Sequence, residues 1–307
     1  MILHPIGRFD NAPADNREIE VRPLAAAMGA EIVGGQLTRL SDAAFAEVRA
    51  ALFRHKMICF RGQDVSRAEH ERFSLRFGPF APDAYTKGVE HHPDVQPVIR
   101  EADARAGMVF GSGWHTDSPF LPQPPSISML YAVDVPPWGG DTMWANAALA
   151  YATLSDAMKT MLAPLRVRMS MRRVLETAQT HQAPDETPLG RIAATRGQAQ
   201  LPAQIARKVE GASHPLVRTH PVTGEKALYC DHTYAIGIDG LTPEEASPLL
   251  RFLADHVTQP AFTCRLRWEA GTFALWDNRL CVHQAFNDTD GFRRELYRTT
   301  VAGETPA

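Results

Sequence analysis

From residue 126 onward the sequence is a series of short apolar segments separated by turn residues, and no other feature limits the fold as strongly. The segments that we predict to be strands are 126–135, 165–171, 216–220, 226–230, 262–268, 272–276, 281–286 and 293–301. Proline and glycine in 221–225 predict a hairpin between two of them. Short strands without regular strand–helix alternation favour antiparallel sheets that close on each other.

Helices are predicted mainly in the early part of the chain. One begins at Ser41, and a second covers about 66–77. A single well-marked later helix begins at Thr242, which has the spacing of a capping box with Glu245. We therefore predict a mainly β protein with flanking helices and a double-stranded β-helix (jelly roll, cupin-like) core.

The chain has 307 residues, and we expect residues 1–307 to form a single domain. A chain of this length can bury a core without a structural metal, so any metal site is expected to be functional. Residues 176–213 are rich in Ala, Gln, Pro and Arg and have weak apolar periodicity. A segment of this kind inside a compact domain is typical of a functional lid or a disordered insert, and we predict a lid insertion there.

Charge and cysteine usage exclude several classes of protein. The formal net charge is −3, which does not give the basic footprint of a nucleic-acid-binding protein. The four cysteines form no CxxC pair and lie in apolar stretches, so we expect buried free thiols. The apolar runs are too short for a membrane span, and the first twenty residues do not resemble a signal peptide. We expect a cytoplasmic protein with neither nucleic-acid nor membrane partners.

A His-x-Asp pair is the first candidate for chemistry. In an extended segment, His115 and Asp117 would point the same way, with Cα atoms about 6–7 Å apart, and could hold one ion together. A third ligand is needed, and the candidates are His214, His220, His232 and His283. His283 lies in an apolar strand, where a histidine is either a satisfied core residue or a ligand.

Two arginines follow His283 on the last predicted strand. Arg294 and Arg298 are four residues apart, so on a strand they share a face with Leu296 and Thr300. An inward-facing arginine is costly unless it meets an anion, and its planar fork suits a carboxylate. The pair therefore predicts a cavity that receives oxyanions.

Over nearly its whole length the chain resembles the TauD/TfdA family of Fe(II)- and 2-oxoglutarate-dependent dioxygenases, the taurine and phenoxyalkanoate dioxygenase type. The segments that carry the resemblance are LAAAMGAEIVGGQL (24–37), WHTDSPFLPQPPSISMLYAVDVPPWGGDTMWAN (114–146), HPLVRTHPVTGEKALY (214–229), FTCRLRW (262–268), WDNRLCVHQAFN (276–287) and RRELYRTTVAG (293–303). The resemblance implies that His115, Asp117 and His283 hold iron. It also implies that Thr142 and Arg294 bind 2-oxoglutarate.

The resemblance implies a substrate pocket as well. Arg298 matches the arginine that meets the anionic group of the substrate in several members, and it could instead assist 2-oxoglutarate. Ser118, Phe120, Tyr85 and Tyr234 match pocket positions, and Gly111 stands where taurine-specific members carry an asparagine that binds the sulfonate.

The expected reaction is hydroxylation of a small organic anion such as a sulfonate, a sulfate ester or an aryloxyalkanoate. It would consume O2 and 2-oxoglutarate, yield succinate and CO2, and could lead to C–O or C–S cleavage. The family also implies a homo-oligomer, either a dimer or a tetramer. The alternatives are a metal-binding jelly roll without oxygenase activity and a Zn-dependent hydrolase, because three N/O ligands and an open position also suit zinc.

Overall fold

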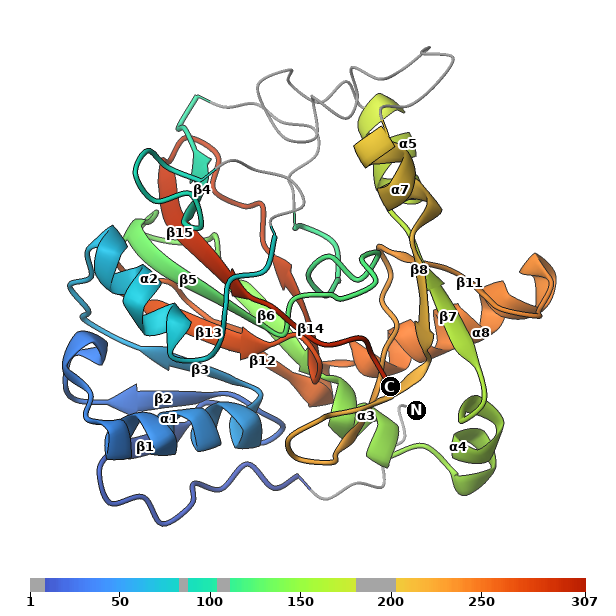
Figure 1. Ribbon diagram of the computed structural model, residues 1–307, viewed down its shortest axis with the longest axis horizontal. Coiled ribbons are helices and arrows are strands. Elements are labelled where there is room, and N and C mark those ends of the chain that lie inside the picture. The colour runs from blue at the N-terminus through green and yellow to red at the C-terminus, as the bar shows by residue number, and fades with distance from the viewer. Residues whose placement is uncertain (1–8, 83–87, 104–110, 181–202) are drawn as a thin grey trace.

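The computed structural model describes residues 9–82, 88–103, 111–180 and 203–307. Its larger sheet has the strand order β1-β2-β3-β13-β5-β15-β4 and is antiparallel except between β2 and β3 (Figure 1). The strands are β1 (Glu20–Pro23), β2 (Ala30–Val33), β3 (Met57–Phe60), β4 (Gln96–Arg100), β5 (Ile127–Asp134), β13 (Phe273–Asp277) and β15 (Arg294–Val301).

A second sheet pairs β12 (Thr263–Leu266), β6 (Thr142–Asn146) and β14 (Cys281–Ala285) in an antiparallel order. Trp144 of this sheet belongs to a buried cluster with Trp276 and Leu296 of the larger sheet. The apolar faces of the two sheets therefore meet, as the alternation of apolar residues along the strands requires. The predicted jelly-roll core is confirmed.

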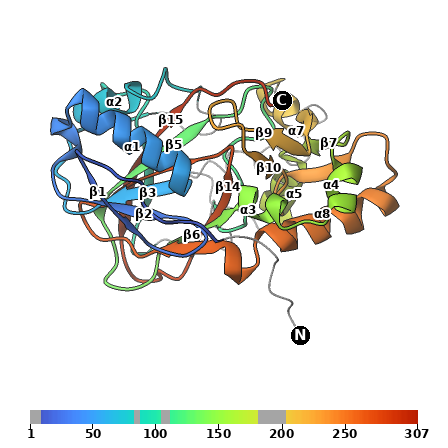
Figure 2. The ribbon, with the colours of Figure 1, turned by 90° about the horizontal axis from the view of Figure 1, so that it is seen from below.

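Helices α1 (Asp42–His55) and α2 (Arg67–Leu75) cover the opposite face of the larger sheet (Figure 2). Ser41 and Ser66 cap their first turns, as helix N-caps of this type do. Leu52 and Phe73 pack there with Phe273. Along β15, alternate residues therefore face opposite sides: Leu296 faces the jelly-roll interior, and Thr299 bonds to His70 of α2.

Two smaller sheets lie beside the jelly roll. One has the order β11-β7-β8, with β7 (Arg166–Met169), β8 (Ala212–Pro215) and β11 (Ala235–Ile238), and the predicted hairpin pairs β9 (Val217–Thr219) with β10 (Lys226–Leu228). The remaining helices are α3 (Ala147–Ala152), α4 (Asp156–Leu162), α5 (Arg172–Thr180), α7 (Ala203–Glu210), α8 (Pro243–Val257) and the 3-10 turns η1 (Leu37–Arg39) and η2 (Pro260–Phe262).

The expectation that most helices come early is wrong. In the part of the chain that the structure describes, α3, α4, α5, α7 and α8 all follow residue 146. Helices α3 and α4 have only six and seven residues, too few to show an apolar period. Asn146 caps α3 and Ser155 caps α4, and these capping residues are the sequence features that could have predicted the two helices.

The predicted lid at 176–213 is described only at its two ends. Helix α5 contacts α7, and β8 follows, so these ends are regular elements, whereas residues 181–202 lie outside the described residues. The lid and the single domain stay predictions.

All four cysteines are buried and free, as expected. Among the described residues, no helix is both long and apolar enough to span a membrane.

Candidate active site

The backbone pairs His115 directly with His283. The His115 amide donates to the His283 carbonyl at 2.9 Å, and the His283 amide donates back at 2.7 Å, so the loop that carries His115 forms a bridge with β14. A mutual pair of this kind places two residues directly opposite each other in an antiparallel ladder. Their rings lie with centroids 4.2 Å apart. Register alone thus brings together two histidines that are far apart in the sequence.

Asp117 completes a group of three potential ligands. Its Oδ1 lies 3.8 Å from His115 Nε2 and 3.9 Å from His283 Nε2. All three ligand atoms lie within 4.8 Å of one another, and all three residues are buried. The two measured separations are less than twice a metal–ligand distance of roughly 2.1 Å, so one ion can touch these donors with only small side-chain shifts. The donor set fits a divalent metal.

Protonation favours this use of the triad. His115 Nδ1 lies 2.7 Å from the Gly113 carbonyl, which accepts a hydrogen bond from Nδ1–H and leaves Nε2 as the ligand atom. Burial, aided by the charge of His115, lowers the pKa of the His283 imidazole to about 3. Burial by itself would raise the pKa of Asp117, but the charges of His283, Arg298 and His115 and a hydrogen bond from Ser128 lower it overall.

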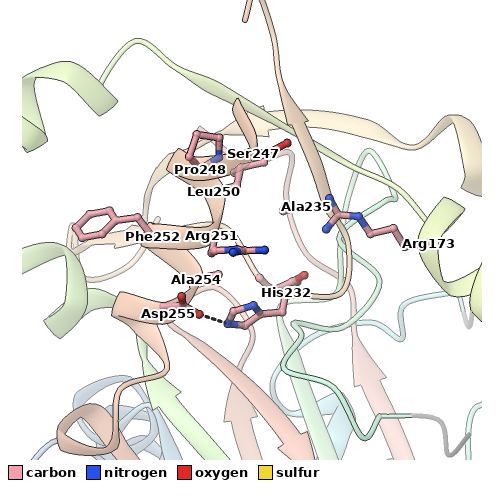
Figure 3. A pocket seen from close by; sticks show the side chains of 11 residues that line it. Arg173, His232, Ala235, Ser247, Pro248, Leu250, Arg251, Phe252, Ala254 and Asp255 are labelled. Atoms are coloured by element: carbon pink, nitrogen blue, oxygen red, sulfur yellow. Dashed lines mark ion pairs between the residues drawn. The ribbon is translucent and has the colours of Figure 1, made fainter. Parts of the chain in front are cut away.

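The other candidate histidines have different partners. His214 Nε2 contacts the Pro119 carbonyl at 2.8 Å, and His220 Nε2 lies 3.0 Å from Asp277. His232 faces a separate pocket of about 710 Å³ beside α8, where it pairs with Asp255 at 3.4 Å (Figure 3). Of the four candidates for the third ligand, only His283 lies in the group with His115 and Asp117.

Thr142 and Arg294 come together around Trp268. The Trp268 indole donates to Thr142 Oγ1 at 2.9 Å, and the Arg294 guanidinium lies 6.0 Å from the centre of the Trp268 ring. Thr142 pairs with Ala285 of β14, two residues beyond His283, so it lies on the strand next to a triad residue and on the same face. Sequence reasoning missed Trp268, although it lies in the family segment FTCRLRW.

Arg294 is a largely buried cation with little to neutralise it. It donates to the Gly140 carbonyl at 3.2 Å, and its Nε has no partner among the residues that the structure describes. Burial lowers its pKa to about 10, although Asp141 and Asp288 oppose this. The guanidinium is still charged at neutral pH, so the arrangement favours an anion beside it.

Arg298, on the same strand as Arg294, lies directly beside the triad. Its Nη1 is 3.8 Å from Asp117 Oδ1, and it shares the interior-facing side of β15 with Arg294 and Leu296. A second cationic group therefore borders the metal ligands, in the position from which it can reach an anion bound at the triad.

Of the predicted pocket residues, Tyr234 and Gly111 lie beside His115. The Tyr234 ring lies 6.2 Å from the His115 ring and 5.4 Å from Phe120. A Cβ added to Gly111 would lie 3.6 Å from His115 Cε1, so this glycine lies beside the ring. Ser118 is buried and adopts a positive φ of 46° directly after Asp117. Tyr85 lies outside the described residues.

Asp231 is a second residue that sequence reasoning missed. Its carboxylate accepts hydrogen bonds from the amides of Thr116, Thr233 and Tyr234. It therefore ties the segment between His115 and Asp117 to the segment that carries Tyr234. A buried acid held by backbone amides could not be found from the sequence, because those partners depend on tertiary structure.

A jelly roll with a His-x-Asp pair, a distant histidine and a buried arginine beside them defines the class of 2-oxoglutarate-dependent dioxygenases, and this protein is an enzyme of that class. The chain belongs to the TauD/TfdA family: residues 20–300 match the family described as "Taurine catabolism dioxygenase TauD, TfdA family".

Individual relatives agree with this assignment. The chain is 36% identical to an alpha-ketoglutarate-dependent sulfate ester dioxygenase of Pseudomonas putida, over 94% of this chain and 91% of that protein. A taurine dioxygenase from Burkholderia xenovorans superposes with a TM-score of 0.76 at 36% identity, covering 95% of this chain and 91% of that one. The protein AAD-2, solved with Mn(II) and N-oxalylglycine, gives a TM-score of 0.74 at 26% identity, covering 94% and 98%.

Proposed function

We propose that His115, Asp117 and His283 hold Fe(II) in this dioxygenase, and that Thr142 and Arg294 hold 2-oxoglutarate. The observation that carries the proposal is the largely buried charge of Arg294 beside Trp268, whose indole donates to Thr142 on the strand next to His283. When bound, ferrous iron chelated by 2-oxoglutarate would supply the activation of O2 that hydroxylates a C–H bond.

The protein's own groups bind and orient the co-substrate. The Trp268 indole donates to Thr142 Oγ1, so the hydroxyl keeps its own proton to donate to a carboxylate. The Arg294 fork can pair with the same carboxylate through two parallel hydrogen bonds. Both contacts lie in a buried setting, where a charge-assisted hydrogen bond is stronger than in water.

For the primary substrate we propose a small organic anion whose charged group pairs with Arg298. Arg298 lies 3.8 Å from Asp117, so an anion there would hold its neighbouring carbon close to the triad. The relative with 36% identity is named for sulfate esters, which makes this class, with sulfonates, the first to test. Hydroxylation of the carbon that bears a sulfate oxygen gives a hemiacetal-type ester, which collapses to an aldehyde and sulfate.

A zinc hydrolase would use the triad but would not need Thr142 and Arg294. Zinc hydrolysis needs three ligands and an open position, and it does not need a second anion site lined by Thr142 and Arg294. The combination of those two residues with the triad therefore favours the oxygenase.

A panel assay tests the proposal. The Fe(II)-loaded protein is incubated with 2-oxoglutarate, O2 and alkyl sulfates, alkyl sulfonates or aryloxyalkanoates, and succinate is measured. We expect succinate above the substrate-free level with at least one anionic class and no increase with the matching neutral alcohols. Equal succinate from the alcohols would contradict an anionic substrate.

A homo-oligomer, a cytoplasmic location and the lid at 176–213 stay predictions of the family resemblance and the sequence.

A further inference from the structure

A chain of buried polar side chains runs from the core of the jelly roll to Asp117. The Trp276 indole donates to Asn278 Oδ1 at 2.9 Å, and Asn278 Nδ2 donates to Ser128 Oγ at 2.8 Å. Ser128 Oγ in turn donates to Asp117 Oδ2. The four side chains come from β13, the turn after it, β5 and the segment before it, and all are buried.

Chemistry allows only one direction for these hydrogen bonds. An indole nitrogen can only donate, so the group that it meets on Asn278 must be the carbonyl oxygen. The amide nitrogen of Asn278 then faces Ser128 and can only donate to it. The Ser128 hydroxyl, having accepted this bond, directs its own proton to the carboxylate of Asp117, which only accepts when ionised.

The consequence is that the two oxygens of Asp117 have different surroundings. Oδ2 is held by the Ser128 hydroxyl, whereas Oδ1 faces His115 Nε2 at 3.8 Å and His283 Nε2 at 3.9 Å. Arg298 would compete with a metal for the same oxygen, because its Nη1 also lies 3.8 Å from Oδ1. Without the Ser128 bond, the carboxylate could rotate to present both oxygens to Arg298, as carboxylates do with a guanidinium fork.

We propose that Ser128 and Asn278 are positioning residues that hold Asp117 as a one-oxygen metal ligand and keep it from pairing fully with Arg298. The proposal rests on the proposed function, since it assumes that the triad binds the metal. Hydrogen-bond partners behind a metal ligand fix its orientation, and their loss typically costs 10–100-fold in metal affinity.

The test measures metal affinity without turnover. Mn(II), which is stable in air, is titrated into the full-length apoprotein, and the decrease of the free Mn(II) signal in electron paramagnetic resonance gives Kd. Ser128→Ala removes the donor to Asp117. Asn278→Asp keeps the size of the side chain but replaces the amide donor by an acceptor, which draws the Ser128 proton away from Asp117.

Ser126→Ala is the matched control. Ser126 is a buried serine two residues earlier whose hydroxyl donates to the Ala302 carbonyl at 2.8 Å, so its loss imposes a similar structural cost away from Asp117. We expect Kd for Mn(II) to rise roughly 10–100-fold in Ser128→Ala and Asn278→Asp and to stay within about twofold in Ser126→Ala. Circular dichroism would confirm that each variant is folded.

Two outcomes would overturn the proposal. If folded Ser128→Ala binds Mn(II) as tightly as the wild type, or if Ser126→Ala weakens binding equally, the chain does not position Asp117. Failure of the proposed function would give a different result: His283→Ala would then bind Mn(II) as tightly as the wild type does. Wild-type binding that depends on His283 but not on Ser128 would therefore reject the positioning role alone.

Discussion

Single residues decide whether the triad can hold a metal. His283 lies fully inside the protein, where burial keeps its imidazole neutral, and His115 presents Nε2 because Nδ1 faces the Gly113 carbonyl. We expect His115→Ala, Asp117→Ala and His283→Ala each to abolish turnover while circular dichroism shows an intact fold. Substantial activity in His283→Ala would contradict the ligand set.

Arg294 is the residue on which co-substrate binding should depend most. Arg294→Ala removes a charge-assisted contact worth roughly 1.5–3 kcal/mol, so Kd for 2-oxoglutarate should rise roughly 10- to 150-fold. The measurement is an anaerobic titration of the Fe(II) protein, followed by the visible band that 2-oxoglutarate chelation produces. Arg293→Ala is the control, because the neighbouring Arg293 is partly exposed and pairs with Glu295 and Glu101 instead. Unchanged affinity in Arg294→Ala would refute the role.

The lowered pKa of His70 predicts how the free energy of unfolding depends on pH. Burial, with a smaller effect of the Arg67 charge, lowers its pKa from 6.5 to about 3. Below pH 6.5 the unfolded chain binds a proton that the folded protein does not, so stability falls as the pH drops towards 3. One such proton contributes about 1.4 kcal/mol per pH unit. Urea unfolding between pH 6.5 and 4 should therefore show a shallower pH dependence in His70→Gln than in the wild type; equal slopes would contradict this.

Sequence reasoning reached some site residues and missed others for a physical reason. His115, Asp117 and the two arginines stand out in local patterns, whereas the choice of His283 among four histidines and the assignment of Thr142 came from the family resemblance. Trp268, Asp231, Ser128 and Asn278 act through partners on other strands or through backbone amides. Their hydrogen bonds exist only after the sheets have formed, so no local pattern could reveal them.

At the scale of elements, β15 carries on one face the two arginines that we propose to bind anions, and their functions should separate in kinetics. Arg298→Ala should raise KM for the primary substrate far more than KM for 2-oxoglutarate, whereas Arg294→Ala should do the reverse. The reason is that Arg298 lies 3.8 Å from Asp117, whereas Arg294 lies beside Trp268. Equal turnover of the true substrate by wild type and Arg298→Ala would contradict an anionic substrate at this position.

Elements with a strong local pattern were predicted well, and the short helices α3 and α4, which lack one, were not. The last three strands and the capping box of α8 lie close to where the sequence places them, because alternation and capping chemistry are local signals. Helices α3 and α4 form because they pack on neighbouring elements, which the sequence does not show.

The lid at 176–213 would be tested by proteolysis: we expect protection of this segment by ligands, and equal cleavage with and without them would count against it.

At the scale of the whole molecule, the fold should not depend on the metal. The buried clusters that join the two sheets and cover them with helices do not include the triad side chains. We expect the chelated protein to keep its circular dichroism spectrum and a cooperative thermal transition. Metal at 100 times Kd should add only about 2.7 kcal/mol, through binding to the folded state alone. Loss of the β-sheet signal on chelation would contradict a purely functional metal.

The most direct test of the account follows the oxygen atoms. The Fe(II) protein is incubated with 2-oxoglutarate, an active organic anion from the panel and isotopically labelled O2, and the products are analysed by mass spectrometry. The account predicts that one labelled atom enters succinate, that succinate and oxidised product form together, and that neither forms without O2 or in Asp117→Ala. Release of the product under anaerobic conditions, with its new oxygen taken from water, would show a hydrolase and would contradict the account.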